Sequence, residues 1–165
     1  MKPFVLIISG TPGTGKSSLA KELSLSKHWK LIDTNKIIQK YSLSEGYDAK
    51  RGSKIVDTKK LIKTLTSIIS ESQHENGIII EGHLSHYLPK KYVNLCVITK
   101  THISTLNKRL KKREYGQEKI RENLESEIFD ICLEEAREKG HKILTIDTTE
   151  LSSKQSAKKL TANLP

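Results

Sequence analysis

The sequence has little of what marks a secreted or membrane-embedded protein. Its two cysteines, Cys96 and Cys132, have no metal-ligand spacing and lie in apolar patterns, which favours reduced core thiols over a disulfide. No apolar run approaches the roughly 20 residues of a membrane span. The apolar stretch at 4–8 is too short for a signal peptide. These features predict an intracellular protein, cytoplasmic or (in a eukaryote) nuclear, with no membrane partner.

Aromatic residues are scarce, at 5% of the chain, and no RNA-binding aromatic motif accompanies the basic residues. The 29 Lys and Arg residues exceed the 19 Asp and Glu residues, so the net charge is +10. This balance favours a polyanionic partner such as RNA. A solvated lysine-rich surface, with the cations of a nucleotide site, explains the charge equally well. The 165 residues, 35% of them hydrophobic, predict one globular domain without repeats or linkers.

The strongest local signal is the sequence GTPGTGKS at residues 10–17. It fits G-x-x-x-x-G-K-[ST], the phosphate-binding Walker A loop. The apolar residues before it indicate a buried strand, and residues 17–27 after it have helical spacing, as the motif requires. Glycines allow positive φ, and the loop N–H groups and the helix N-terminus attract phosphate. Lys16 is expected to reach the β- and γ-phosphates, and Ser17 to ligate Mg²⁺.

Strand and helix patterns alternate along the rest of the chain. Strands are predicted at 29–32, 77–82, 93–99 and 142–147, and helices at 34–43, 58–74, 101–113, 117–139 and 152–164. Residues 44–54 are polar and contain two glycines, which predicts a loop. The helix at 117–139 is expected to bury Ile120, Leu124, Ile128, Ile131 and Cys132. The alternation predicts an α/β fold, with a five-stranded parallel sheet flanked by helices and a cleft at its carboxyl ends.

Glu81 ends an apolar strand, where a P-loop protein places its Walker B carboxylate. It is expected to hold Mg²⁺, usually through a water, or to orient a nucleophile. A helix cap or a solvent-facing acid is the alternative. His83, two residues on, is predicted to position a water or an acceptor phosphate, although a single histidine is usually structural. The remaining histidines are expected to be surface or packing residues: His28, His74, His86, His102 and His141.

Arg109 and Arg113 are four residues apart and therefore share one helix face. Arginine forks suit phosphoryl oxygens, and phosphoryl transfer needs such cations over the γ-phosphate. Three lysines on the same helix make a solvated basic face the alternative. Spacing alone does not separate the two.

Several motifs occur together: GTPGTGKSSLAKEL, then GYD at 46–48, EGH at 81–83 followed by Pro89, and RLKKREYGQEKIRENLESEIF at 109–129. This series resembles the adenylate-kinase-like ATPase family of small-ribosomal-subunit maturation, which includes the nuclear coilin-interacting ATPase and its archaeal relatives. The similarity runs from about residue 4 to 147. It implies an adenylate-kinase-type P-loop fold in one domain, 1–165. Within it, a nucleoside-monophosphate-binding segment is expected at about 33–56 and a short lid at about 112–122.

The resemblance also implies ligands and roles. ATP and Mg²⁺ are the expected cofactors, AMP or another nucleoside monophosphate the acceptor, and a small-subunit ribosomal protein and rRNA the partners. Together with the chemistry of the residues themselves, the resemblance assigns catalysis to Lys16, His83, Arg109 and Arg113, and metal binding to Ser17 and Glu81. The residues expected to bind ATP are Gly10, Pro12, Gly13, Thr14, Gly15, Lys16, Ser17, Ser18 and Arg113.

Three positions depart from the family pattern. Glu81 replaces an aspartate, Leu84 replaces a glycine, and Gln39 replaces an arginine that Lys36 or Arg51 is a candidate to substitute. ATP binding is therefore a firmer expectation than monophosphate kinase activity. The prediction is an adenylate kinase, an ATPase, or both, acting in ribosomal maturation. The alternatives are a small-metabolite P-loop kinase and an assembly chaperone in which nucleotide gates partner binding.

Overall fold

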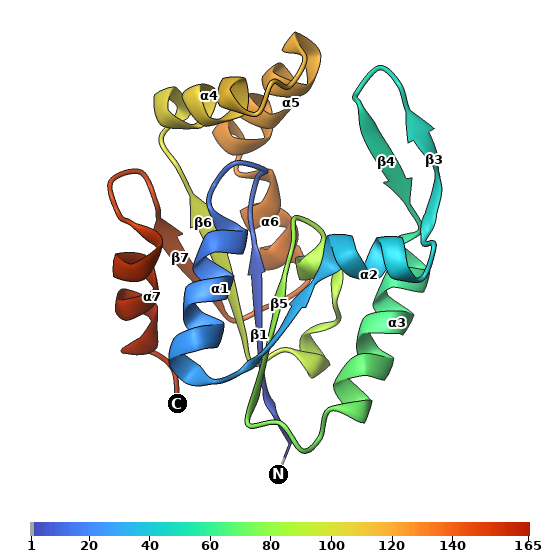
Figure 1. The fold of residues 1–165 in the computed structure, drawn as a ribbon, viewed down its shortest axis with the longest axis vertical. Coiled ribbons are helices and arrows are strands. Elements are labelled where there is room, and N and C mark those ends of the chain that lie inside the picture. The colour runs from blue at the N-terminus through green and yellow to red at the C-terminus, as the bar shows by residue number, and fades with distance from the viewer. Residues whose placement is uncertain (1) are drawn as a thin grey trace.

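The computed structural model describes residues 2–165. Its main sheet has five parallel strands in the order β2-β5-β1-β6-β7 (Figure 1). The predicted α/β class and five-stranded parallel sheet are therefore confirmed. The strands are β1 (Phe4–Ser9), β2 (Lys30–Asp33), β5 (Gly77–Glu81), β6 (Leu95–Lys100) and β7 (Ile143–Asp147).

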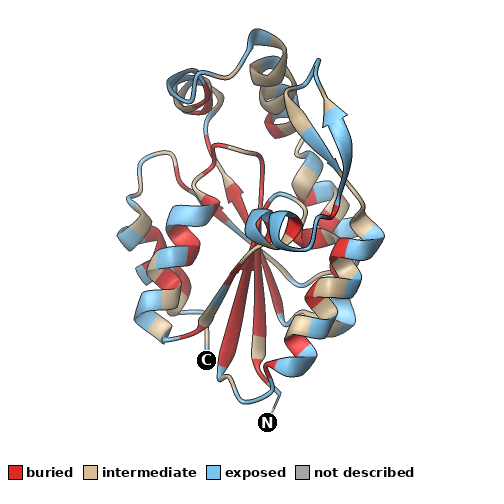
Figure 2. Ribbon diagram, turned by 45° about the vertical axis from the view of Figure 1, so that its right-hand side comes forward, coloured by how far each residue is buried: buried red, intermediate tan, exposed pale blue. Residues whose placement is uncertain are grey.

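Helices cover both faces of this sheet (Figures 1 and 2). On one face lie α1 (Lys16–Lys27) and α7 (Ser153–Thr161). On the other lie α3 (Thr58–Glu71), α6 (Ile131–Glu138) and the short 3-10 helices η1 (Ser85–Tyr87) and η2 (Lys90–Tyr92). Beyond the carboxyl ends of the strands lie α2 (Thr34–Lys40), α4 (Ile103–Lys112) and α5 (Gln117–Ile128) (Figure 1). None of the helices within residues 2–165 combines the length and apolarity needed to cross a lipid bilayer.

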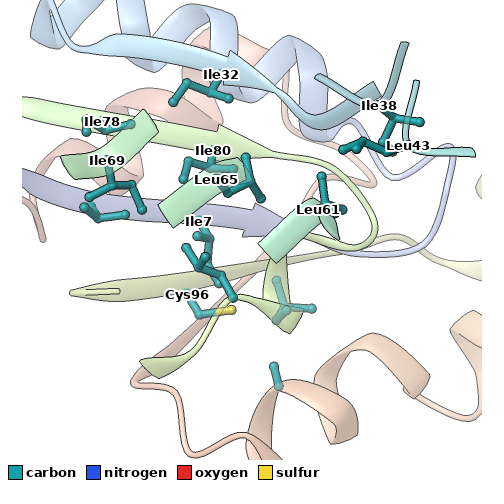
Figure 3. Close-up of a cluster of buried hydrophobic side chains, with 14 of the residues drawn as sticks. Ile7, Ile32, Ile38, Leu43, Leu61, Leu65, Ile69, Ile78, Ile80 and Cys96 are labelled. Carbon is teal, nitrogen blue, oxygen red and sulfur yellow. The ribbon is translucent and has the colours of Figure 1, made fainter. Parts of the chain in front are cut away.

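The strands are apolar on both sides because alternate residues meet different helix layers. Leu6 and Ile8 of β1 pack in the cluster under α1 and α7. Val5 and Ile7 pack in the cluster under α3 and α6, part of which Figure 3 shows. The sheet is thus held between two layers of helices, and its carboxyl edge is left free for a site.

Most predicted boundaries are correct to within three residues. Asp33 caps α2, accepting a hydrogen bond from Asn35 N at 2.8 Å, and Asp57 caps α3, accepting one from Lys60 N at 3.1 Å. Gly140 follows α6 with φ of 73°, the left-handed conformation expected after a helix end.

The prediction of a loop at 44–54 is wrong. β3 (Ser44–Asp48) and β4 (Ser53–Val56) form an antiparallel hairpin with its tip at 49–52 (Figure 1). Asp48 Oδ1 accepts hydrogen bonds from Lys50 N and Arg51 N at 3.0 and 3.1 Å, which stabilises the turn. The two strands pair with each other and bury almost no side chain, so the sequence carries no alternating apolar pattern.

The prediction of one helix at 117–139 is also wrong. The chain breaks between α5 and α6, where Asp130 has a φ of 53°. Lys100 of β6 holds the break, since its Nζ donates to Glu127 O at 3.2 Å and bonds the Asp130 carboxylate. The predicted buried face is lost with the continuous helix. Ile128 and Ile131 are 56% and 42% exposed, and Ile120, Leu124 and Cys132 are half-buried.

Candidate active site

The loop between β1 and α1 requires its glycines for both conformation and space. Gly10, Gly13 and Gly15 have φ values of 143°, 93° and 85°. A Cβ on Gly10 would lie 2.4 Å from Thr99 Oγ1, and one on Gly13 would lie 2.8 Å from Leu106 Cδ1. Because α1 begins immediately after the loop, its first N–H groups face the concavity and favour an anion there.

Threonine hydroxyls from two strand ends support this loop. Thr14 Oγ1 donates to Thr11 O at 2.7 Å and lies 2.6 Å from Thr99 Oγ1. Thr148 Oγ1 donates to Thr14 O at 2.8 Å. Thr99 belongs to β6 and Thr148 follows β7, so the strand ends expected to converge do meet beneath the loop.

Lys16 and Ser17 start α1, beside the carboxylate that ends β5. Lys16 is buried and its Nζ donates to Thr11 O at 3.1 Å. Burial lowers the pKa of Lys16 to about 8, although the nearby Glu81 opposes the shift. A phosphate group would be a stronger partner for this ammonium than a loop carbonyl.

Glu81 is 4% exposed, and its Oε1 accepts a hydrogen bond from Ser17 Oγ at 2.9 Å. Burial raises the pKa of Glu81. The pair supplies two oxygen donors, which fits Mg²⁺, an ion that takes one or two protein oxygens and completes its shell with water and phosphate. No group of three or more His, Cys, Asp and Glu side chains that could hold a metal ion gathers among residues 2–165.

His83 lies two residues beyond the end of β5, after a sharp turn at Gly82, where φ is 148°. Gly82 N donates to Ile8 O at 3.1 Å, which fixes this turn beside the end of β1. The protein walls around His83 and the charge of Lys16 lower the pKa of His83, so the ring is neutral at pH 7. The side chain is open to solvent on one side, and water there limits this shift.

Two cavities adjoin the loop, one on each side. The α7-side cavity, of about 520 Å³, is lined by Ser18, Leu19, Arg109 and Leu151, among others. The hairpin-side cavity, of about 820 Å³, lies between the loop, α2, the hairpin and α5. The two cavities share Gly13, Gly15, Ser18 and Arg113. Of the other predicted residues, Pro12, Lys16, Ser17, Glu81 and His83 line the hairpin-side cavity.

Arg109 and Arg113 differ in their surroundings. Arg109 donates from Nη2 to Thr148 O at 2.8 Å and from Nη1 to Gly13 O at 3.3 Å, so it braces the loop while lining the α7-side cavity. Arg113 ends α4 and borders both cavities. Because Arg113 borders both cavities, its guanidinium is placed to act on phosphate groups where ligands in the two cavities meet.

The hairpin tip and α5 meet over the larger cavity through two ion pairs and one hydrogen bond. Lys50 Nζ lies 3.3 Å from Glu118 Oε1, and Arg51 Nε lies 3.3 Å from Glu122 Oε1. Lys119 Nζ donates to Gly52 O at 3.0 Å. These contacts join the segments expected to be the monophosphate-binding segment and the lid.

Comparison with known proteins places the chain in a family. Residues 6–130 match a family described as an AAA domain. A Methanosarcina acetivorans protein named "Putative adenylate kinase" is 35% identical over 153 residues, covering 91% of this chain and 80% of that protein. A Dictyostelium discoideum protein named as an adenylate kinase isoenzyme 6 homolog is 34% identical over 136 residues, covering 82% of this chain and 75% of that protein. The chain belongs to the adenylate-kinase-like family of P-loop proteins.

The fold of this adenylate-kinase-like protein also matches solved P-loop kinases. Shikimate kinase from Acinetobacter baumannii superposes with a TM-score of 0.65 at 16% identity, covering 98% of this chain and 92% of that one. At this identity the likeness concerns the fold.

Sequence reasoning missed one polar cluster at the site of this adenylate-kinase-like protein. His86, expected to be a surface or packing residue, is buried between Ser9 and Glu135. Glu135 lies on α6 and lines the hairpin-side cavity. The partners are 77 and 49 positions away in the sequence, so no local motif signals the cluster.

Proposed function

We propose that the protein transfers the γ-phosphoryl group of ATP to AMP or another nucleoside monophosphate. The observation that carries this proposal is the pair of cavities on either side of the phosphate loop, which share Gly13, Gly15 and Arg113. Two nucleotides could enter from opposite sides with their phosphates meeting beside Lys16. The names of the relatives support the same reaction class.

In the proposed mechanism, the loop N–H groups and Lys16 hold the β- and γ-phosphates of ATP. Ser17 and Glu81 would hold Mg²⁺, which when bound neutralises charge on the transferring group. The neutral ring of His83 orients the acceptor phosphate, and Arg113 stabilises the charge that develops between donor and acceptor. The hairpin and α5 exclude water from the larger cavity.

Water competes with AMP as the phosphoryl acceptor. Leu84 and Gln39 depart from the family pattern, and both line the hairpin-side cavity in which AMP would bind. These two changes weaken the case for an AMP site. Lys36 and Arg51 line the same cavity and supply cations that Gln39 does not. The cavity thus retains positive charge for an acceptor phosphate, which favours transfer to AMP over hydrolysis.

A coupled assay of ADP formation from ATP, with and without AMP, tests the proposal. We expect AMP to accelerate ADP formation and Lys16→Ala to abolish it without changing the melting temperature. A rate that is independent of AMP would assign ATP hydrolysis instead. Acceleration by a nucleoside or by shikimate, and not by AMP, would assign a small-metabolite kinase.

We also propose that the protein acts in small-ribosomal-subunit maturation, with a small-subunit ribosomal protein and rRNA as partners. The family resemblance and the net charge of +10 support this role. Affinity for a small-subunit rRNA fragment should fall steeply with salt, because each neutralised phosphate releases counterions. A flat salt response, or no binding at low salt, would leave the charge as a solvated surface. A nucleotide-dependent affinity for the ribosomal protein without ATP turnover would favour a chaperone.

A further inference from the structure

A buried polar network joins the hairpin-side cavity to the end of β1. His86 of η1 is 1% exposed. Its Nδ1 lies 2.6 Å from Ser9 Oγ, and its Nε2 lies 2.7 Å from Glu135 Oε2. Tyr87 donates its hydroxyl hydrogen to the other carboxylate oxygen, Oε1, at 3.2 Å. The network fixes both oxygens of Glu135 from one side.

Glu135 itself is not enclosed. Its side chain is 35% exposed and lines the hairpin-side cavity. A carboxylate has about four lone-pair positions, so two hydrogen bonds leave capacity for another donor. Burial lowers the pKa of His86, which favours the neutral ring. In the neutral tautomer that donates from Nε2 to the Glu135 carboxylate, Nδ1 is left to accept from Ser9. The cavity wall thus presents a hydrogen-bond acceptor in a fixed position.

The cavity that Glu135 lines suits the nucleoside part of the nucleotide that would receive the phosphoryl group. The same cavity is lined by apolar or aromatic side chains, among them Ile38, Val56 and Tyr87, against which a base can pack. A carboxylate repels a phosphate group, so the part of a nucleotide that it can contact favourably is the base or the ribose, which carry N–H and O–H groups. A carboxylate fixed in the wall of a cavity that also has apolar lining selects a ligand that offers an N–H or O–H group.

We propose that Glu135 is a specificity-determining residue that accepts a hydrogen bond from an N–H or O–H group of the acceptor nucleoside. His86 is the positioning residue that holds the Glu135 carboxylate. This inference rests on the proposed function, since it names a recognition contact within the acceptor cavity. The donor is either a base amine or a ribose hydroxyl, and the choice of acceptor analogue distinguishes them.

Two substitutions of His86 separate positioning from packing. The amide of Asn reaches the place of Nδ1, so His86→Asn keeps a partner for Ser9 and loses the one for Glu135. The longer Gln reaches the place of Nε2, so His86→Gln keeps the contact with Glu135. We expect His86→Asn to raise the KM for AMP about tenfold or more, and His86→Gln to restore it to within about threefold. The KM for ATP should stay within about twofold in both. Equal KM values for AMP in the two variants would overturn the positioning role.

Glu135→Gln tests the recognition contact directly, with Glu134→Gln as its matched control. Glu134 is on the same helix, is 53% exposed and pairs with Arg137. The acceptors are AMP, purine riboside 5′-monophosphate, which lacks the base amine, and 2′-deoxy and 3′-deoxy AMP. In the parent protein, kcat/KM should fall about tenfold or more for the analogue that lacks the contacted donor. Glu135→Gln should lower kcat/KM for AMP and erase this discrimination, whereas Glu134→Gln should preserve both.

Unchanged kcat/KM and unchanged discrimination in Glu135→Gln would overturn the inference. If His86 variants fail to fold, Glu135→Gln still decides, because its side chain lies on the cavity wall. Failure of the proposed function is distinguishable by calorimetry on the parent protein with AMP and a non-hydrolysable ATP analogue. If AMP binds and no phosphoryl group is transferred, the variants are compared by their dissociation constants for AMP and its analogues. The same ratios between variants are expected there. Absence of AMP binding would overturn both the function and the inference.

Discussion

The ion pairs between the hairpin tip and α5 predict a measurable closing energy for the larger cavity. Glu118→Gln with Glu122→Gln removes the α5 partners of Lys50 and Arg51 and leaves both basic residues, and the pair of Arg51 with Asp48 inside the hairpin, in place. The side chains of Lys50 and Arg51 are 78% and 61% exposed, so each pair contributes about 0.2–1 kcal/mol. Together they amount to about 0.4–2 kcal/mol, or a change of about 2- to 30-fold in the ratio of closed to open states.

Limited trypsin digestion measures this ratio because Lys50 and Arg51 are themselves cleavage sites at the hairpin tip. Where opening and closing are fast, the cleavage rate follows the open population. We expect the double variant to be cut about 2- to 30-fold faster at 50–51 than the parent. Raising the salt concentration should accelerate cleavage of the parent, because ions screen exposed pairs, and should change the double variant much less.

Glu125→Gln is the control for this experiment. Glu125 pairs at 3.8 Å with Arg121 on the same helix and reaches nothing across the cavity. The reasoning is refuted if the double variant and Glu125→Gln are cut at the same rate. It is also refuted if cleavage of the parent is insensitive to salt.

Four further predictions follow from the site and the core. His83→Ala should lower phosphoryl transfer about 10²- to 10⁴-fold while the ATP dissociation constant, measured by calorimetry, stays within a few-fold; full turnover would return His83 to a packing role. Arg113→Ala should lower kcat more than ATP affinity, since a cation shared by both cavities acts in the reacting state, and a raised KM alone in steady-state kinetics would contradict this. Leu65→Ala should destabilise the fold by about 2–5 kcal/mol in urea denaturation, because Leu65 is 1% exposed in the core under α3; a loss below 1 kcal/mol would contradict that packing. Hydrogen bonds from the first turn of α3 lower the pKa of Asp57 below its ordinary 3.8, so its capping stabilises above that pH and is lost as pH falls through the folded-state pKa. Asp57→Ala should therefore lower the melting temperature at pH 7 and differ less from the parent at pH 3, whereas an equal difference at both values would exclude the charged cap.

Local chemistry determined much of this protein. The phosphate loop at 10–17 can be predicted from sequence because its glycines, Lys16 and Ser17 lie within one short segment between a buried strand and a helix. The strands of the parallel sheet can be predicted because strands that are buried on both faces must be continuously apolar. The caps at Asp33 and Asp57 depend on N–H groups only two or three residues away. Each of these features is contained in a few consecutive residues.

Only the folded structure decided the rest, because it depends on which surfaces are left unpacked and on contacts between distant parts of the chain. The hairpin at 44–56 pairs with itself and touches little of the core, so no apolar alternation marks its strands. The break after α5 is held by Lys100, which is 30 positions from Asp130. His86 acquires a role only where Ser9 and Glu135 are brought to its two ring nitrogens. A short sequence window contains one partner of such a contact and never both, and only folding creates the pair.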